Sequence, residues 1–164
     1  ANKNVVAVLQ LDMTNYRSSN GYDVYIQNST SNNAVMQFFR DLFAAYLKPL
    51  GKTLGTSSCG YSCSDHASWT SAGFPAGMLD EGPIFSYLHT ANDQLQYMGG
   101  TANHSVSFAQ MGVAFAVELG KNGATGGGDD GGGCCHYPGF QFGLEALHLC
   151  LLLINRLSTW TTLR

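Results

Sequence analysis

The feature that most constrains the fold is an apolar run close to the start of the chain. Residues 5–11 are all apolar except Gln10, and Asp12 follows directly. A run of this length without polar alternation is typical of a strand buried on both faces. A strand of that kind belongs to a sheet covered by helices on both sides, so the run favours an α/β fold.

Strand and helix patterns alternate after this run. Residues 22–26 and 74–79 predict two further strands. A helix is predicted over 33–48, capped by Asn32 or Asn33 and ended by Pro49. A short helix is predicted from Thr90, because Thr90 and Asp93 make a capping-box-like start. Two further helices are predicted over 64–72 and 106–119. The alternation predicts a three-layer αβα sandwich, or part of one, around a mostly parallel or mixed central sheet.

The chain changes character near residue 120. We expect a single domain over residues 1–120, then a flexible linker over 121–133, because that segment is rich in glycine. Residues 134–164 form a tail of unknown role with a helix-like apolar stretch, too short and too polar at its start for a membrane span. It is compatible with a core-docking or partner-binding helix, and equally with a translated non-coding or frameshifted end.

Composition restricts the class of protein. The net charge is −3 and charged residues make up only 12%, with no run of lysine or arginine, so a nucleic-acid partner is not expected. A surface covered by uncharged polar residues is common in extracellular proteins. The chain also opens almost directly into a strand, so we interpret Ala1 as a truncation point.

The cysteines predict an oxidising environment. Cys59 and Cys63 flank a short loop containing a glycine, which fits a local disulfide, and the alternative is a pair of free buried thiols. The pairing of Cys134, Cys135 and Cys150 cannot be read from the sequence. An odd total leaves at least one thiol free or intermolecular.

Two residues are candidate metal ligands. Asp12 stands just beyond the carboxyl end of a predicted strand, where α/β proteins bind ligands, although an aspartate there also serves as a turn or cap residue. His89 directly precedes the helix predicted from Thr90, and a helix N-terminus favours a neutral, metal-ready imidazole. The alternative for His89 is a structural role. Residues alone therefore predict an extracellular α/β domain with a candidate metal site.

Three segments carry a resemblance to a known family. They are Val8–Tyr16 (VLQLDMTNY), Cys59–Trp69 (CGYSCSDHASW), and Leu88-His89-Thr90 with Asp93. In this order they closely resemble the bacterial leucyl aminopeptidases, secreted exopeptidases with two co-catalytic zinc ions. The resemblance covers about residues 4–120 and implies that Asp12 binds one Zn2+ and His89 the other. A zinc pair of this kind binds the substrate amine, polarises the scissile carbonyl and activates water.

The resemblance also implies a substrate pocket for the N-terminal side chain of a peptide, with a preference for apolar, leucine-like residues. Tyr61, on a disulfide-bearing wall, would stabilise the transition state through its hydroxyl. The implied pocket residues are Met13, Ile26, Cys59, Cys63, Met78 and Phe85. Ordinary core packing is the alternative for Ile26 and Phe85.

The chain departs from the family in its ligand set. The family's other ligands (a histidine, a bridging aspartate and a glutamate) and its general-base glutamate lie upstream, and nothing before Val5 supplies them. The carboxylates Asp23, Asp41, Asp80 and Glu81 do not stand in matching contexts. The expectation is therefore the C-terminal part of an aminopeptidase, inactive alone and complemented by a missing N-terminal half.

Two alternatives use the same fold. One is a non-catalytic peptide-binding or interaction module, with the tail as its partner contact. The other is a different zinc acyltransferase or peptidase, against which the segment Cys59–Trp69 argues.

Overall fold

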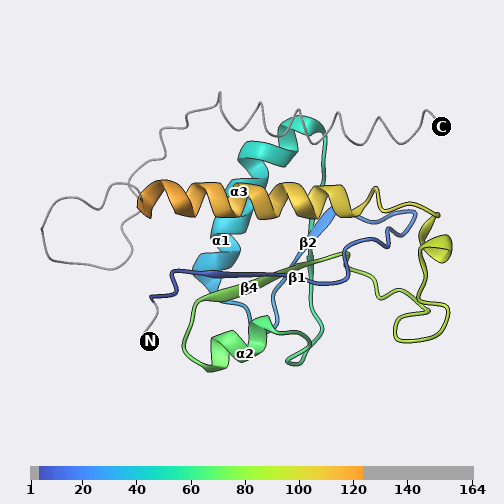
Figure 1. The fold of residues 1–164 in the computed structure, drawn as a ribbon, viewed down its shortest axis with the longest axis horizontal. Helices are drawn as coiled ribbons and strands as arrows, with labels where there is room; N and C mark the ends of the chain where they lie inside the picture. Colours follow the sequence, from blue (N-terminus) through green and yellow to red (C-terminus); the bar gives the residue numbers. More distant parts are fainter. Residues whose placement is uncertain (1–3, 124–164) are drawn as a thin grey trace, which may run out of the picture. The chain divides into compact units, whose positions relative to one another are not determined.

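A four-stranded mixed sheet forms the centre of the computed structural model, which describes residues 4–123 (Figure 1). The strands are β1 (Val8–Leu11), β2 (Val24–Gln27), β3 (Leu54–Ser57) and β4 (Ala76–Asp80), in the order β1-β4-β2-β3. Strand β1 is parallel to β4 and β2 is parallel to β3, whereas β2 and β4 are antiparallel. The predicted α/β class with a mixed sheet is confirmed.

The first helix shows the predicted cap but a different end. Helix α1 (Asn33–Leu42) is capped by Asn32, whose side-chain oxygen accepts from the N–H groups of Ala34 at 2.9 Å and Val35 at 3.3 Å. The chain then continues as a π-helical turn over Phe43–Leu47 and a 3₁₀ turn over Lys48–Leu50. Pro49 therefore lies inside the last turn, and the prediction that it ends the helix is wrong.

Helices cover both faces of the sheet. On one face α1 packs against β4 so closely that a Cβ atom at Gly77 would lie 2.7 Å from the Phe39 ring. The start of α3 (Ser105–Gly123) lies on the same face, where Gly112 faces the side chain of Leu11. Helix α2 (His66–Ser71) contacts β4 and β1 from the other side (Figure 1). The predicted three layers are present.

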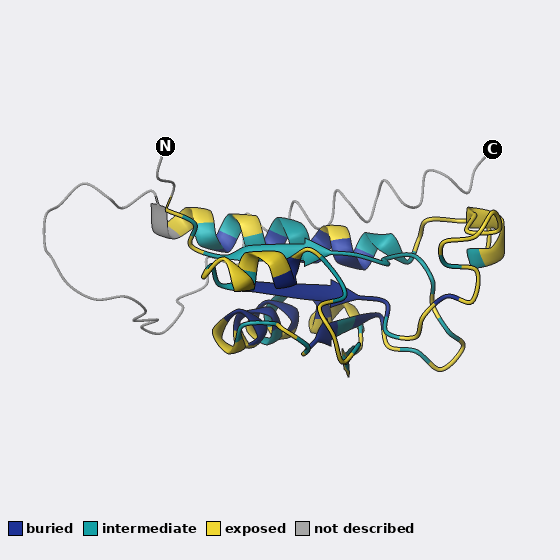
Figure 2. Cartoon of the chain, turned by 90° about the horizontal axis from the view of Figure 1, so that it is seen from below, coloured by how far each residue is buried: buried dark blue, intermediate teal, exposed yellow. Residues whose placement is uncertain are grey.

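Burial differs sharply between the strands. Every residue of β4 is buried, whereas those of β1 are only partly buried (Figure 2). Among the described strands, β1 lies at the edge of the sheet. The prediction of a strand near residues 5–11 is confirmed, but its burial on both faces is not, because the central position belongs to β4.

The segment after β4 contains no helix at the predicted place. Residues 87–93 form turns, in which the Thr90 hydroxyl donates to the carbonyl of Tyr87 at 2.7 Å. A single 3₁₀ turn follows at Leu95–Met98. The predicted helix from Thr90 is wrong, and with it the argument that a helix N-terminus keeps His89 neutral.

Several predictions fall outside the described residues. The expected tail over 134–164 lies outside residues 4–123, and so does most of the expected linker. Residues 121–123 of that linker belong to α3. Within residues 4–123, no helix combines the length and the apolar character needed to cross a membrane.

Candidate functional site

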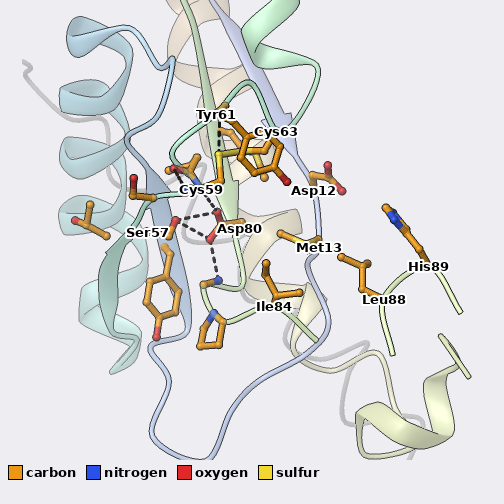
Figure 3. Close-up of a pocket in the computed structure, with 17 residues that line it drawn as sticks. Asp12, Met13, Ser57, Cys59, Tyr61, Cys63, Asp80, Ile84, Leu88 and His89 are labelled. Atoms are coloured by element: carbon orange, nitrogen blue, oxygen red, sulfur yellow. Dashed lines mark hydrogen bonds between the residues drawn. A yellow bond between two sulfur atoms is a disulfide. The ribbon is translucent and has the colours of Figure 1, made fainter. Parts of the chain in front are cut away.

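A pocket of about 360 Å³ lies beside the sheet. It is lined by four separate parts of the chain: the turn after β1, strand β2, the end of β3 with the loop that follows, and the segment from β4 to residue 89 (Figure 3). The predicted site residues that line it are Asp12, Met13, Cys59, Tyr61, Cys63, Met78 and His89. The fold therefore gathers most of the predicted site in one place.

Asp12 and Met13 form a tight turn at the end of β1. The Asp12 N–H donates to the carbonyl of Leu79 at 3.3 Å, and its carboxylate accepts from the Ser64 hydroxyl at 2.7 Å. Met13 has a left-handed backbone with φ of 55°, a conformation that is costly for a residue with a side chain. This turn aims both side chains at the pocket (Figure 3).

His89 reaches the pocket from a distant part of the sequence. It is exposed, its backbone is also left-handed with φ of 61°, and its N–H donates to the Asp93 carboxylate at 3.3 Å. Figure 3 draws Asp12 and His89 at one side of the pocket. Strained backbone of this kind concentrates at functional sites, and two of the three non-glycine residues with positive φ in residues 4–123 belong to this pocket.

The loop after β3 carries a disulfide between Cys59 and Cys63. Gly60 turns the chain with φ of 75°, and its N–H donates to the Ser29 hydroxyl at 2.9 Å. Tyr61, at the tip, is 65% exposed. The loop therefore holds an accessible phenol at the mouth of the pocket.

Ile26 and Phe85 do not line the pocket. Ile26 is 1% exposed and pairs with Leu79 across the sheet, while its strand neighbours Tyr25 and Gln27 face the pocket, because successive residues of a strand point to opposite faces. Phe85 is 3% exposed, with its ring centroid 5.0 Å from that of Tyr16. Both residues therefore lie in the core, which was the alternative to a place in the pocket.

The pocket also contains a carboxylate that the sequence did not single out. Asp80 is 1% exposed and accepts hydrogen bonds from the Ser57 hydroxyl at 2.8 and 2.9 Å, the Gln27 amide at 3.1 Å and the Gly82 N–H at 2.8 Å (Figure 3). Burial raises the pKa of Asp80, the hydrogen bonds oppose that rise, and the charge of Asp12 adds to it. A signal was available, because an aspartate ending a buried strand is also what singled out Asp12.

The neighbouring Glu81 points elsewhere. It is 3% exposed, and its carboxylate accepts from the Tyr16 N–H at 2.6 Å. The pKa of Glu81 is raised to about 7, chiefly by burial and in smaller part by the charges of Asp80 and Asp93, against the lowering effect of backbone hydrogen bonds. Glu81 does not line the pocket.

The described residues do not complete a zinc centre. Over residues 4–123, no group of three or more histidine, cysteine, aspartate or glutamate side chains is placed to hold a metal ion. Zinc sites in proteins use three or four protein ligands. Asp12 and His89 alone therefore do not fit a zinc pair.

Comparison with known proteins gives a consistent result. The profile of Peptidase family M28 matches residues 1–114. Leucine aminopeptidase 1 of Arthroderma gypseum is 33% identical in an alignment covering 73% of this chain and 33% of that protein. Leucine aminopeptidase 1 of Aspergillus oryzae is 30% identical in an alignment covering 71% of this chain and 31% of that protein.

Solved structures share the fold. LapB from Legionella pneumophila superposes with a TM-score of 0.62 and 33% identity, over 70% of this chain and 31% of that one. The LapA aminopeptidase of Legionella pneumophila gives a TM-score of 0.61 and 32% identity, over 69% of this chain and 31% of that one. The chain spans about a third of the length of the relatives it matches.

Proposed function

The chain belongs to Peptidase family M28, and on that premise we propose that it is the C-terminal part of an aminopeptidase that removes N-terminal residues from peptides. The observation that carries the proposal is the meeting of Asp12, Tyr61 and His89 at one pocket, although they come from three separate segments. The names of the relatives, leucine aminopeptidases, support the same activity.

Each group has a proposed role. The pocket takes the side chain of the N-terminal residue, and the exposed Tyr61 hydroxyl donates a hydrogen bond to the oxygen of the scissile carbonyl. Asp12 and His89 each contribute one ligand to a different Zn2+, and the remaining ligands come from a part of the protein outside this chain. The relatives' names favour an apolar, leucine-like N-terminal residue.

The same reasoning predicts that this chain alone is inactive. One ligand per ion does not hold zinc tightly, and the general base of the family is also missing. A complementary N-terminal half is therefore the partner we propose. The disulfide and the low charge content support secretion, since disulfides persist in oxidising compartments.

Zinc content and turnover of the purified 164-residue chain test this proposal. We expect no tightly bound zinc and no hydrolysis of a leucyl chromogenic amide. A protein that holds two zinc ions and loses its activity to a chelator would contradict the proposed inactivity and show that other residues complete the centre.

The non-catalytic peptide-binding module is the second candidate. Two observations on residues 4–123 favour it: they form a pocket, and they contain no group of three metal-ligating side chains. Hydrolysis after addition of the missing half of the protein would exclude it. Peptide binding that never leads to turnover in the complemented protein would favour it.

A further inference from the structure

The floor of the pocket carries a negative charge without a positive partner. Asp80 lines the pocket and is 1% exposed, and the groups that donate to it, Ser57, Gln27 and Gly82, are all neutral. The ion pairs that the structure shows between residues 4 and 123 all lie elsewhere. A buried carboxylate without a cation is costly, so a cation entering the pocket would be stabilised there.

The hydrogen bonds leave room for that cation. A carboxylate offers about four acceptor sites. The Ser57 hydroxyl lies within bonding distance of both oxygens but has one proton, so Ser57, Gln27 and Gly82 together supply three protons. One acceptor site of Asp80 is left for a further N–H donor.

The walls of the pocket suit the stem of a long basic side chain. Met13, Met78, Ile84 and Leu88 line it, and no lysine or arginine of residues 4–123 does. Lysine and arginine side chains pack their aliphatic stems on apolar surface while the charged head seeks a polar partner. Apolar walls ending at a carboxylate match that division.

The position of the carboxylate also suits one bound residue. Figure 3 draws Asp80 apart from Asp12 and His89, with Met13 on the side of the pocket that faces His89. A ligand with its α-amine near Asp12 and its side chain directed inward would bring the end of that side chain towards Asp80. A leucine side chain would instead leave the Asp80 charge unpaired.

We infer that the pocket selects peptides with a basic N-terminal residue, lysine or arginine, whose cationic head pairs with the Asp80 carboxylate. This inference rests on the proposed function, because it assumes that the pocket holds the N-terminal side chain. It replaces the apolar preference that the relatives' names favour.

The experiment compares two probes on the purified 164-residue chain. L-lysinamide and L-norleucinamide share the amine, the amide and the aliphatic stem, and differ in the terminal ammonium. Binding is measured by NMR titration at pH 7. We expect lysinamide to bind at least about tenfold more tightly, since pairing with a poorly solvated carboxylate stabilises the ammonium.

Variants assign the preference to one residue. Asp80→Asn should remove it, because the amide is nearly isosteric but uncharged. The matched control is Asp41→Asn, which removes the same charge from an exposed residue on α1 outside the pocket and should keep the preference. If Asp80→Asn does not fold, the wild-type chain still decides: lysinamide must shift the Gly82 amide resonance, whose N–H is bonded to Asp80, and norleucinamide must not.

The outcomes distinguish the basic preference from the proposed function. Equal or tighter binding of norleucinamide, an unchanged preference in Asp80→Asn, or no selective shift at Gly82 would overturn the basic preference and leave the proposed function standing. Failure of both probes to bind would overturn the basic preference, because pairing with Asp80 would then not hold a lysine side chain in this pocket, and the proposed function would be tested by turnover in the complemented protein.

Discussion

Asp80 and Glu81 are adjacent carboxylates with different surroundings. Asp80, the last residue of β4, is held by side chains and one backbone N–H at the pocket, whereas Glu81 is buried against the backbone of Tyr16. Burial raises the pKa of both. At this scale the strand end serves two purposes, because Asp80 lines the pocket and Glu81 helps to hold the turn after β1.

Glu81 should make stability depend on pH. Its pKa in the folded protein is about 7, against an ordinary value of 4.5, so the folded state holds this proton more tightly than the unfolded state does. The contribution is fully present below pH 4.5 and is lost as the pH rises through 7, by up to about 3 kcal/mol. Glu81→Gln should remain stable at pH 8 and gain about 1 to 3 kcal/mol over the wild type there.

Urea unfolding at pH 5 and pH 8 measures this effect. The control is Asp65→Asn, since Asp65 is exposed and its side chain caps nothing, and this variant should keep the wild-type difference between the two pH values. A wild-type chain that is equally stable at both pH values would contradict the prediction.

The sequence predicted part of the site at this scale. Asp12 and His89 do line one pocket, and their proposed zinc roles are still predictions. Asp80 and Glu81 were set aside because they matched no family context. Their importance comes from burial beside segments that are distant in sequence, β2 and β3 for Asp80 and the turn after β1 for Glu81, and this cannot be read from neighbouring residues.

The close approach of α1 to β4 controls packing at the scale of elements. A Cβ atom at position 77 would lie 2.7 Å from the Phe39 ring and 2.9 Å from the Val35 side chain. We expect Gly77→Ala to lower the free energy of unfolding by about 1 to 3 kcal/mol, because both contacts must give way.

A matched substitution separates this clash from a general effect of alanine. Gly120 is exposed in α3, where an added Cβ atom would have no neighbour within 4 Å among residues 4–123 outside the helix's own backbone, so Gly120→Ala should stabilise by up to about 1 kcal/mol. Chemical denaturation of both variants gives the comparison. Equal effects at the two sites would show that the packing of α1 on Gly77 is looser than described.

Element prediction succeeded for α1 and failed for β3 and for the segment after Thr90. The apolar spacing and the Asn32 cap predicted α1, but β3 has only one apolar side chain in Leu54–Ser57 and was missed. The helix expected from Thr90 was wrong because Thr90 and Asp93 bond within turns instead. Local signals of this kind do not distinguish a cap from a turn.

At the scale of the whole molecule, the chain corresponds to only part of its relatives. The chain spans about a third of its relatives, and residues 4–123 contain no three-ligand metal group. Zinc should therefore not raise the thermal midpoint of the purified chain, because an ion stabilises a fold only through preferential binding to it. Melting with zinc and with a chelator checks this. A midpoint that rises with zinc concentration would contradict it.

The family and the fold class could be predicted from three short segments and the alternation of strands and helices. The partly exposed edge at β1 could not, because the order of strands is set by pairing between distant segments. The roles expected for the linker and the tail concern residues outside 4–123 and are still predictions.

One buried side chain has a wider consequence. The Gln27 amide donates through its nitrogen to Asp80 and accepts through its oxygen from the N–H groups of Ser29 and Cys59. It thereby links the floor of the pocket to the loop that presents Tyr61. A substitution at Asp80 is therefore expected to reach the loop that carries Tyr61 through Gln27, so the floor of the pocket and its mouth should not vary independently of each other.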